Sequence, residues 1–224
     1  HTRFALVCGL GDVYKRQKVD PFKIELKGGR IIYTTSTAYK TAIKDSARSF
    51  ECKVTILDKV YKNEDIVDII IDGNIQPSDG FMIGATTSQS LDLTLINKGD
   101  IVYGTSTIKV EIGLKIGSTV EYIPIGIYNI DDIEKTDYTI KITAFDNMMK
   151  FERNFSTTLG DTLTLQQVVS ELNRITGVEF TGTLPSYNVK KLEGFSCREI
   201  LSYVASICGG NAIITRDGKF TIVT

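Results

Sequence analysis

Residues 138–144 read YTIKITA, and apolar side chains alternate with polar ones along the whole stretch. Successive side chains of a β-strand point to opposite faces, so this pattern predicts a strand with one buried face and one face in water. The residues expected inside are Tyr138, Ile140, Ile142 and Ala144. Such a strand belongs in an antiparallel sheet that covers a core on one side only.

The stretches that precede this strand have the same character. Alternation recurs in residues 50–56, 91–95 and 108–112. Two further stretches are apolar almost throughout, residues 66–71 and 120–130. In the second of these, Pro124 and Gly126 predict an edge position or a β-bulge. Six or more half-buried strands with short, turn-rich links predict an antiparallel β-barrel or sandwich.

The spacing of apolar residues becomes helical after Phe155. The first helical stripe consists of Leu165, Val168, Val169, Leu172 and Ile175. Thr164 and Gln167 form a capping box in front of it, and Gly177 ends it.

A second predicted helix begins with a capping box of Ser196 and Glu199 and ends at Gly209-Gly210. A hairpin follows, with its turn at Asp217-Gly218. Two helices and one hairpin can cover one another, which predicts a small α+β domain.

These patterns divide the chain into three parts. Residues 1–17, HTRFALVCGLGDVYKRQ, show neither strand alternation nor helical spacing, and they resemble translated sequencing-adapter read-through. We therefore expect a non-native leader at 1–17, a β-domain at 18–155 and an α+β domain at 156–224. The chain stops at Thr224 in mid-strand, which predicts truncation because a natural end there would leave an exposed strand edge.

Residues able to carry out chemistry are scarce. The only histidine is His1, so a Ser-His-Asp or Cys-His site cannot be built from the rest of the chain. The cysteines lack the CxxC spacing of zinc sites. We therefore predict no enzyme, no catalytic residue, no cofactor and no metal. Two acids that meet across a cleft stay open as an alternative, since nothing singles out a pair.

Three weaker features have a plain structural interpretation. Cys197 lies in the first turn of a predicted helix, where the dipole can lower a thiol pKa, but no base or second cysteine lies nearby in the sequence. The acids of residues 131–137 match no calcium loop and predict an acidic turn between strands. The tyrosines on strands predict core or interface residues rather than a stacking platform: Tyr33, Tyr39, Tyr61, Tyr103, Tyr122, Tyr128 and Tyr138.

Bulk composition excludes two kinds of partner surface. The net charge of −1 provides no long-range field to gather nucleic acid or an anionic membrane. No apolar run approaches the ~18 residues of a membrane span, so we expect no membrane insertion.

Two blocks of the sequence carry a family resemblance. The first is SFECKVTI, IVDIIIDGNIQPSDGFMIGATTSQSLDLTL and VEYIPIGIYNIDDIEKTDYTIKITAFDNMMKFE; the second is TLQQVVSELNRITGVEF and GFSCREILSYVASICGGNAIITRDGKFTIV. In this order they resemble the first domains of phage and prophage tail baseplate, or tail-tip, hub proteins from Gram-positive hosts. The resemblance covers roughly residues 18–224 and departs at Leu159-Gly160-Asp161, which looks like inserted loop sequence.

The resemblance implies a virion structural protein of the tail tip, assembled in the bacterial cytoplasm. It implies a homotrimeric ring of β-barrel domains that joins the tail tube to the tip. The implied partners are further copies of the chain and other tail proteins (tail tube, distal tail and tape measure), with at most passive contact to DNA in the channel. The family pattern offers no catalytic residue in this region.

Two other functions remain open on sequence alone. A carbohydrate-binding module at the phage tip requires an exposed aromatic cluster on one sheet face or loop. A tail-associated lysin or peptidase requires converging catalytic groups. A secreted adhesin fragment is a weaker third hypothesis, because the sequence shows no export signal.

Overall fold

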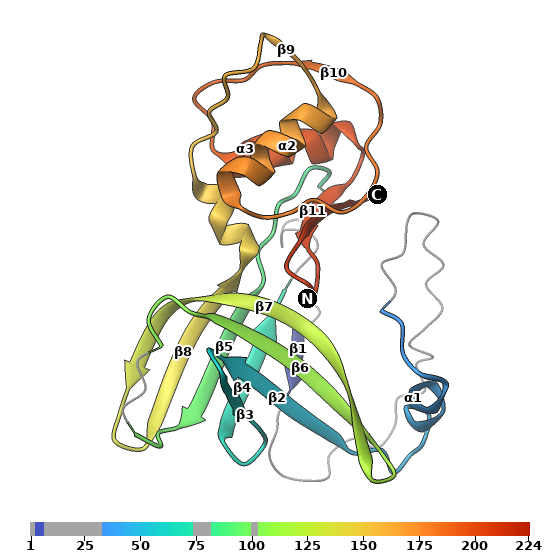
Figure 1. Cartoon of the computed structure of the whole chain (residues 1–224), viewed down its shortest axis with the longest axis vertical. Coiled ribbons are helices and arrows are strands. Elements are labelled where there is room, and N and C mark those ends of the chain that lie inside the picture. Colours follow the sequence, from blue (N-terminus) through green and yellow to red (C-terminus); the bar gives the residue numbers. More distant parts are fainter. Residues whose placement is uncertain (1–2, 7–32, 74–81, 100–102) are drawn as a thin grey trace.

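The protein is mainly β, with a few short helices (Figure 1). A computed structural model describes residues 3–6, 33–73, 82–99 and 103–224. The sheet-forming part holds β1 (Arg3–Leu6), α1 (Thr37–Ala42), β2 (Phe50–Ile56), β3 (Lys59–Tyr61), β4 (Ile66–Asp72), β5 (Ser90–Ile96), β6 (Thr107–Ile116), β7 (Thr119–Lys135) and β8 (Thr139–Asp146). The rest holds η1 (Asn147–Glu152), β9 (Thr162–Thr164), α2 (Leu165–Thr176), β10 (Asn188–Lys190), α3 (Cys197–Ile207), β11 (Asn211–Ile214) and β12 (Phe220–Val223).

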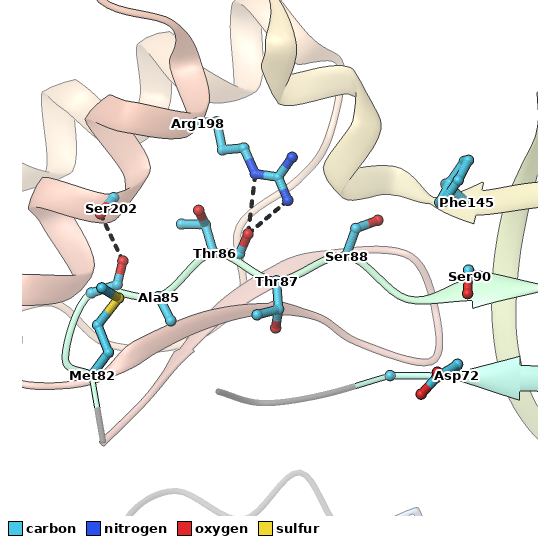
Figure 2. A pocket seen from close by; sticks show the side chains of 12 residues that line it. Asp72, Met82, Ala85, Thr86, Thr87, Ser88, Ser90, Phe145, Arg198 and Ser202 are labelled. Carbon is cyan, nitrogen blue, oxygen red and sulfur yellow. Dashed lines mark hydrogen bonds between the residues drawn. The ribbon is translucent and has the colours of Figure 1, made fainter. Parts of the chain in front are cut away.

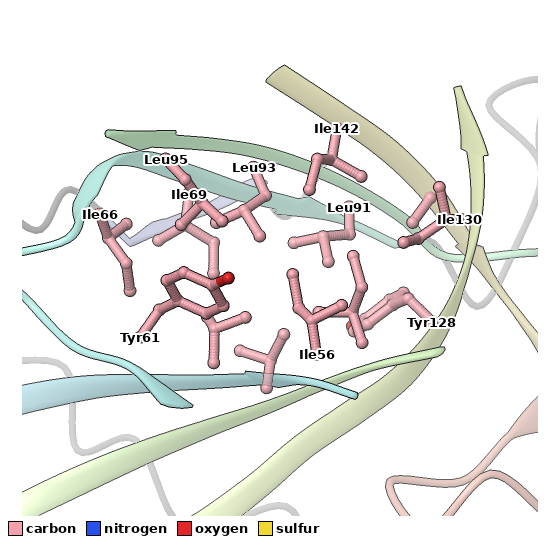
Figure 3. Packing of buried hydrophobic residues seen from close by; sticks show 14 of the residues in the cluster. Ile56, Tyr61, Ile66, Ile69, Leu91, Leu93, Leu95, Tyr128, Ile130 and Ile142 are labelled. Carbon is pink, nitrogen blue, oxygen red and sulfur yellow. The ribbon is translucent and has the colours of Figure 1, made fainter. Parts of the chain in front are cut away.

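One antiparallel sheet of eight strands, in the order β1-β4-β5-β8-β7-β6-β2-β3, forms the larger part of the fold. The sheet curls over its own apolar side, so that β4, β5 and β8 face β2, β6 and β7 across the core (Figure 3). Among the described strands the hydrogen-bonded ladder does not close, since β1 and β3 each have one neighbour. The mainly β and α+β class is confirmed, and the sandwich alternative describes the sheet better than a closed barrel.

The alternation of the sequence places the core side chains of this sheet. Leu91, Leu93 and Leu95 are fully buried, as are Ile142 and Ala144. Two expected members lie outside the core: Tyr138 is 83 % exposed and Phe50 is 40 % exposed. Phe50 is the first residue of β2 and Tyr138 directly precedes β8, so the alternation of the sequence extends beyond the buried part of each strand.

The long strand β7 is irregular where proline and glycine predicted it. Its register with β6 shifts between the pairs of Val110 with Gly126 and Glu111 with Pro124. A second shift, against β8, falls between Ile130 and Asp132. The bulge is confirmed, whereas the edge position is not observed, because β7 pairs with β6 on one side and β8 on the other.

Arg3–Leu6 form a strand although the sequence of residues 1–17 shows no strand alternation. These residues form β1, which pairs antiparallel with β4 from Arg3 opposite Asp72 to Leu6 opposite Ile69. The outer edge of β4 offers unpaired backbone groups, and any extended segment can satisfy them whatever its alternation. The other residues of 1–17 lie outside the described part of the chain.

A second cluster of buried residues is built around α2 and α3. Both predicted capping boxes are present, with Thr164 bonded to Gln167 and Ser196 to Glu199, and Gly177 adopts the left-handed conformation (φ 72) that ends α2. The hairpin β11–β12 packs in the same cluster. Met148, Phe151 and Phe155 also belong to it, so apolar packing of this α+β unit begins before Ser156. The domain division at Phe155 stays a prediction.

Candidate assembly surfaces

The β4–β5 connection joins the two clusters and is named here the strap (residues 82–89). It leaves the sheet and runs beside the hairpin of the α+β unit, as Figure 2 shows. Gly84 N–H donates to Gly210 O at 2.8 Å, and Ala212 N–H donates to Ala85 O at 2.8 Å. Thr86 and Ala212 form a parallel bridge. The strap therefore adds a strand-like segment to the edge of β11, across more than a hundred residues of sequence.

Side chains of α3 fix the strap from the other side. The Arg198 guanidinium donates to Thr86 O from Nε (3.1 Å) and Nη2 (2.8 Å). Ser202 Oγ donates to Gly84 O at 2.7 Å, as drawn in Figure 2. These bonds satisfy backbone groups that the sheet ladder leaves free. The shallow pocket beside the strap is lined mostly by strap residues together with Arg198 and Ser202.

Gly84 is the tightest point of the strap. Its φ is +88, and an added Cβ would lie 2.0 Å from Ser206 Oγ and 2.9 Å from Ser202 O. We expect Gly84→Ala to lower the free energy of unfolding by about 1–3 kcal/mol from backbone strain alone, and by more where Ser206 cannot move. Urea denaturation measures the loss. Gly160→Ala is the control, because nothing lies within 4 Å of its added Cβ; equal losses in both variants would contradict this interpretation of the strap.

Two buried side chains at the start of η1, Asp146 and Asn147, bond the strap and the hairpin turn respectively. The Asp146 carboxylate accepts from Ser88 Oγ (2.8 Å), Gln89 N (2.9 Å) and Met148 N (3.0 Å). Burial raises the pKa of Asp146 above its usual value, against the effect of these bonds. The Asn147 amide donates to Gly218 O, in the hairpin turn, at 2.6 Å. The connection between the two clusters is thus polar but internally satisfied.

The single residues weighed on sequence do not converge on a reactive site. Cys197 is fully buried, and burial raises the pKa of its thiol to about 11, the opposite of activation. The expected acidic turn is wrong in part, because Asp131, Asp132 and Glu134 lie within β7 and only Asp137 follows it. Among the described residues no group of three or more His, Cys, Asp or Glu side chains could hold a metal ion.

The strand tyrosines divide between core and surface. Tyr61, Tyr103 and Tyr128 are buried, and the hydroxyls of the first two lie 3.0 Å apart. The Tyr122 ring is half-buried, and Lys53 Nζ lies over it. Of the seven tyrosines considered on sequence, Tyr33 and Tyr138 are the clearly exposed ones, and they come from separate parts of the chain. Their arrangement fits core and interface residues better than a stacking platform for sugars or bases.

The outer side of β2 and β6 carries a basic network, named here the lysine face. Its members are Lys53, Lys62, Lys109 and Lys115, with Glu51 and Glu111 between them. Lys53 Nζ lies 2.7 Å from Glu111 and 4.0 Å from the centre of the Tyr122 ring. Glu111 also pairs with Lys109 at 3.1 Å, and Glu51 with Lys62 at 3.1 Å. Four lysines against two glutamates leave this face positive.

Glu111 lies at the centre of the lysine face and is only 8 % exposed. Burial alone raises the pKa of Glu111, but its bonds to Lys53 and Lys109 outweigh burial and hold the pKa below the ordinary 4.5. A lowered folded-state pKa stabilises the fold above pH 4.5, and that stabilisation is lost as the pH falls through the folded value.

We therefore expect Glu111→Gln to have a lower unfolding free energy than the wild type at pH 7. At strongly acidic pH, where Glu111 is protonated, the two chains are expected to have similar unfolding free energies. Denaturant melts across the acidic range measure both chains. Glu193→Gln is the control, since Glu193 is exposed and pairs with the nearby Lys191. A constant difference between Glu111→Gln and wild type at every pH would contradict the assignment.

The outer side of β4, β5 and the second half of β7 has the opposite charge and is named here the acidic face. Its members are Asp68, Asp72, Asp92, Asp132 and Glu134, with Lys141 as the one lysine among them. Alternation predicted that Asp92 and Lys141 point to water. It did not predict that the sheet gathers like charges from strands up to about 70 residues apart, because the order of strands in a sheet cannot be deduced from the local sequence pattern.

Comparison of the whole fold with solved structures found similar chains. The 43 kDa tail protein of prophage MuSo2 from Shewanella oneidensis matches with a TM-score of 0.50 and 15 % identity, over 78 % of this chain and 55 % of that one. The tail protein from Neisseria meningitidis MC58 matches with a TM-score of 0.53 and 12 % identity, over 77 % of this chain and 51 % of that one. This chain has the fold of prophage tail proteins.

The similarity to these tail proteins extends over both clusters of buried residues, since it covers more than three quarters of the chain. The chain spans only about half the length of either tail protein. No protein-family model matches the sequence, and a search of the curated proteins found no match. In the described part of the chain, no helix has the length and apolar character needed to cross a membrane.

Proposed function

We propose that this chain is a structural subunit of a phage or prophage tail, at the baseplate or tail-tip hub. The similarity of its fold to two prophage tail proteins is the observation that carries the proposal. The two blocks of sequence that resemble hub proteins of Gram-positive hosts agree with it in order and extent. In this role the chain forms a homotrimeric ring that joins the tail tube to the tip.

The described surfaces support a scaffold rather than a catalyst. The outer sheet faces carry broad charged networks, whereas the groups weighed for catalysis are buried or dispersed. We therefore propose no catalytic residue and no bound cofactor or metal. The proposed partners are other copies of the chain and the neighbouring tail proteins (tail tube, distal tail and tape measure), with passive contact to DNA at most. The proposed location is the virion tail tip.

The complete gene product tests this proposal by its assembly state. Light scattering coupled to gel filtration is expected to give the mass of a trimer, and negative-stain images are expected to show threefold rings. A stable monomer at micromolar concentration would overturn the ring proposal. Cell-wall degradation by purified residues 18–224 would favour the lysin alternative, and binding on a glycan array would favour the carbohydrate-binding alternative.

A further inference from the structure

We propose that the acidic face of one copy docks on the lysine face of a second copy, in a head-to-tail contact. This inference rests on the proposed function in one respect, namely that copies of this chain meet in one assembly. It goes further by naming the two surfaces that meet and by stating that the contact is head-to-tail.

The register of the sheet shows that the acidic face is continuous. One row across the strands runs from Asp68 through Thr94 and Lys141 to Glu134. The next row runs from Ile70 through Asp92 and Thr143 to Asp132. Neighbouring strands lie about 4.8 Å apart, so these rows cover a compact patch roughly 15 Å wide. A patch of this size is large enough to form part of a protein interface.

Three carboxylates of the acidic face form no ion pair within the described part of the chain. Asp92 accepts a hydrogen bond from Thr143 Oγ1 at 3.1 Å, and no described lysine or arginine forms an ion pair with Asp92, Asp132 or Glu134. Asp68, Asp92, Asp132 and Glu134 stand against Lys141 alone, whereas Asp72 lies opposite Arg3 of β1. The two rows of the patch are therefore negative, although the whole chain has a net charge of only −1. The charge is therefore separated across the subunit rather than absent from it.

The lysine face offers the complementary surface. Its lysines outnumber its glutamates, and Glu111 is shared between Lys53 and Lys109, so positive charge is left over to meet an outside anion. Both faces also carry exposed β-branched side chains beside their charges. Val67 and Ile70 on β4 are 50 % and 41 % exposed, and Val60 on β3 is 52 % exposed. Apolar centres within charged borders are typical of protein interfaces.

The direction of the contact follows from the way the sheet curls. The two layers enclose the core, so the outer side of β4 and β5 points away from the outer side of β2 and β6 (Figure 3). Two acidic faces repel each other, as do two lysine faces, which disfavours a twofold symmetric contact. Opposite faces that attract produce a heterologous contact, the type from which rings or filaments are built.

Charge reversal on each face tests the contact in the 224-residue chain. The acidic-face variant is Asp132→Lys/Glu134→Lys, and the lysine-face variant is Lys109→Glu/Lys115→Glu. Sedimentation velocity at low ionic strength is expected to show concentration-dependent self-association of the wild type. In each variant alone, the dissociation constant is expected to rise on the order of tenfold or more, because like charges then face each other. An equal mixture of the two variants is expected to associate again.

Matched variants carry the same charge changes away from both faces. Asp161→Lys/Glu193→Lys and Lys44→Glu/Lys190→Glu change exposed residues and are expected to associate like the wild type. Circular dichroism melts establish that every variant is folded. Raising the salt to about 1 M, where the Debye length is about 3 Å, is expected to weaken the wild-type contact.

Three outcomes would overturn the inference: a wild-type chain that does not associate, reversed variants that associate unchanged, or a mixture that fails to recover. Unchanged association of the reversed variants would leave the ring proposal standing with a different interface. A monomeric complete gene product would instead overturn the ring proposal, whereas open head-to-tail chains of the wild type would support the contact without the ring.

Discussion

A fragment of residues 146–224 is expected to show no cooperative unfolding transition, although it contains both helices and the hairpin of the α+β unit. The same fragment is expected to fold when the strap is restored to it. The reason is that the edge of β11 is completed by a segment from the other part of the chain. Thermal melts followed by circular dichroism, together with amide hydrogen exchange, measure the difference.

The contacts that the fragment loses are specific and partly buried. Ala85 is 4 % exposed, and its N–H donates to Asn211 Oδ1 at 2.9 Å. Without the strap, the backbone of Gly210 and Ala212 loses its partners, and Arg198 loses the carbonyl it binds. Each buried polar group left without a partner costs about 1–3 kcal/mol. A unit of fewer than about 80 residues rarely has more than 3–5 kcal/mol of stability to lose.

The register of β5 and β8 indicates how to build the restored fragment. Ser90 lies opposite Phe145, and Asp146 N–H donates to Gln89 O at 3.0 Å. Residues 82–91 can therefore be joined to residues 144–224 by a tight Asn-Gly turn that replaces the rest of the sheet. The matched control carries Gly84→Val in the joined strap. If the fragment without the strap melted at the same temperature as the joined one, the strap would not be needed for folding.

The parts of this fold that depend on local pattern were predictable. Alternation placed the core side of β5 and β8, and the two capping boxes located the first turn of α2 and of α3 correctly. In each case the physical cause lies within a few residues of sequence. A side chain two or three positions away decides which face is wet or which backbone N–H is satisfied.

The parts that depend on distant pairing were not predictable. The strap contains no alternation, and its ordered structure comes from carbonyls and amides of Gly210 and Ala212. The segment around Phe180 similarly joins β12 through backbone bonds, with Phe220 N–H donating to Glu179 O. The opposite charge of the two sheet faces also required the strand order. A single sequence indicates that side chains are outward, but not which others lie beside them.

Phe220→Ala is expected to be the most damaging single substitution in the α+β unit, with a loss of about 3–5 kcal/mol in unfolding free energy. The Phe220 side chain is fully buried between two rings. Its centroid lies 5.2 Å from that of Phe151, edge to face at 76°, and 5.2 Å from that of Phe180. Truncation therefore removes burial, two aromatic contacts and the packing of η1 on the hairpin.

Urea denaturation of the full chain measures the loss, and Tyr138→Ala is the matched control. Tyr138 is 83 % exposed, so its truncation is expected to change the free energy by no more than about 0.5 kcal/mol. Phe220→Leu is expected to fall between the two, because it keeps most of the apolar volume and loses the ring contacts. In Phe220→Ala, amide exchange is expected to accelerate first in β11, β12 and η1, since these elements surround the cavity that the missing ring leaves. A loss for Phe220→Ala as small as that for Tyr138→Ala would contradict the central place of this ring.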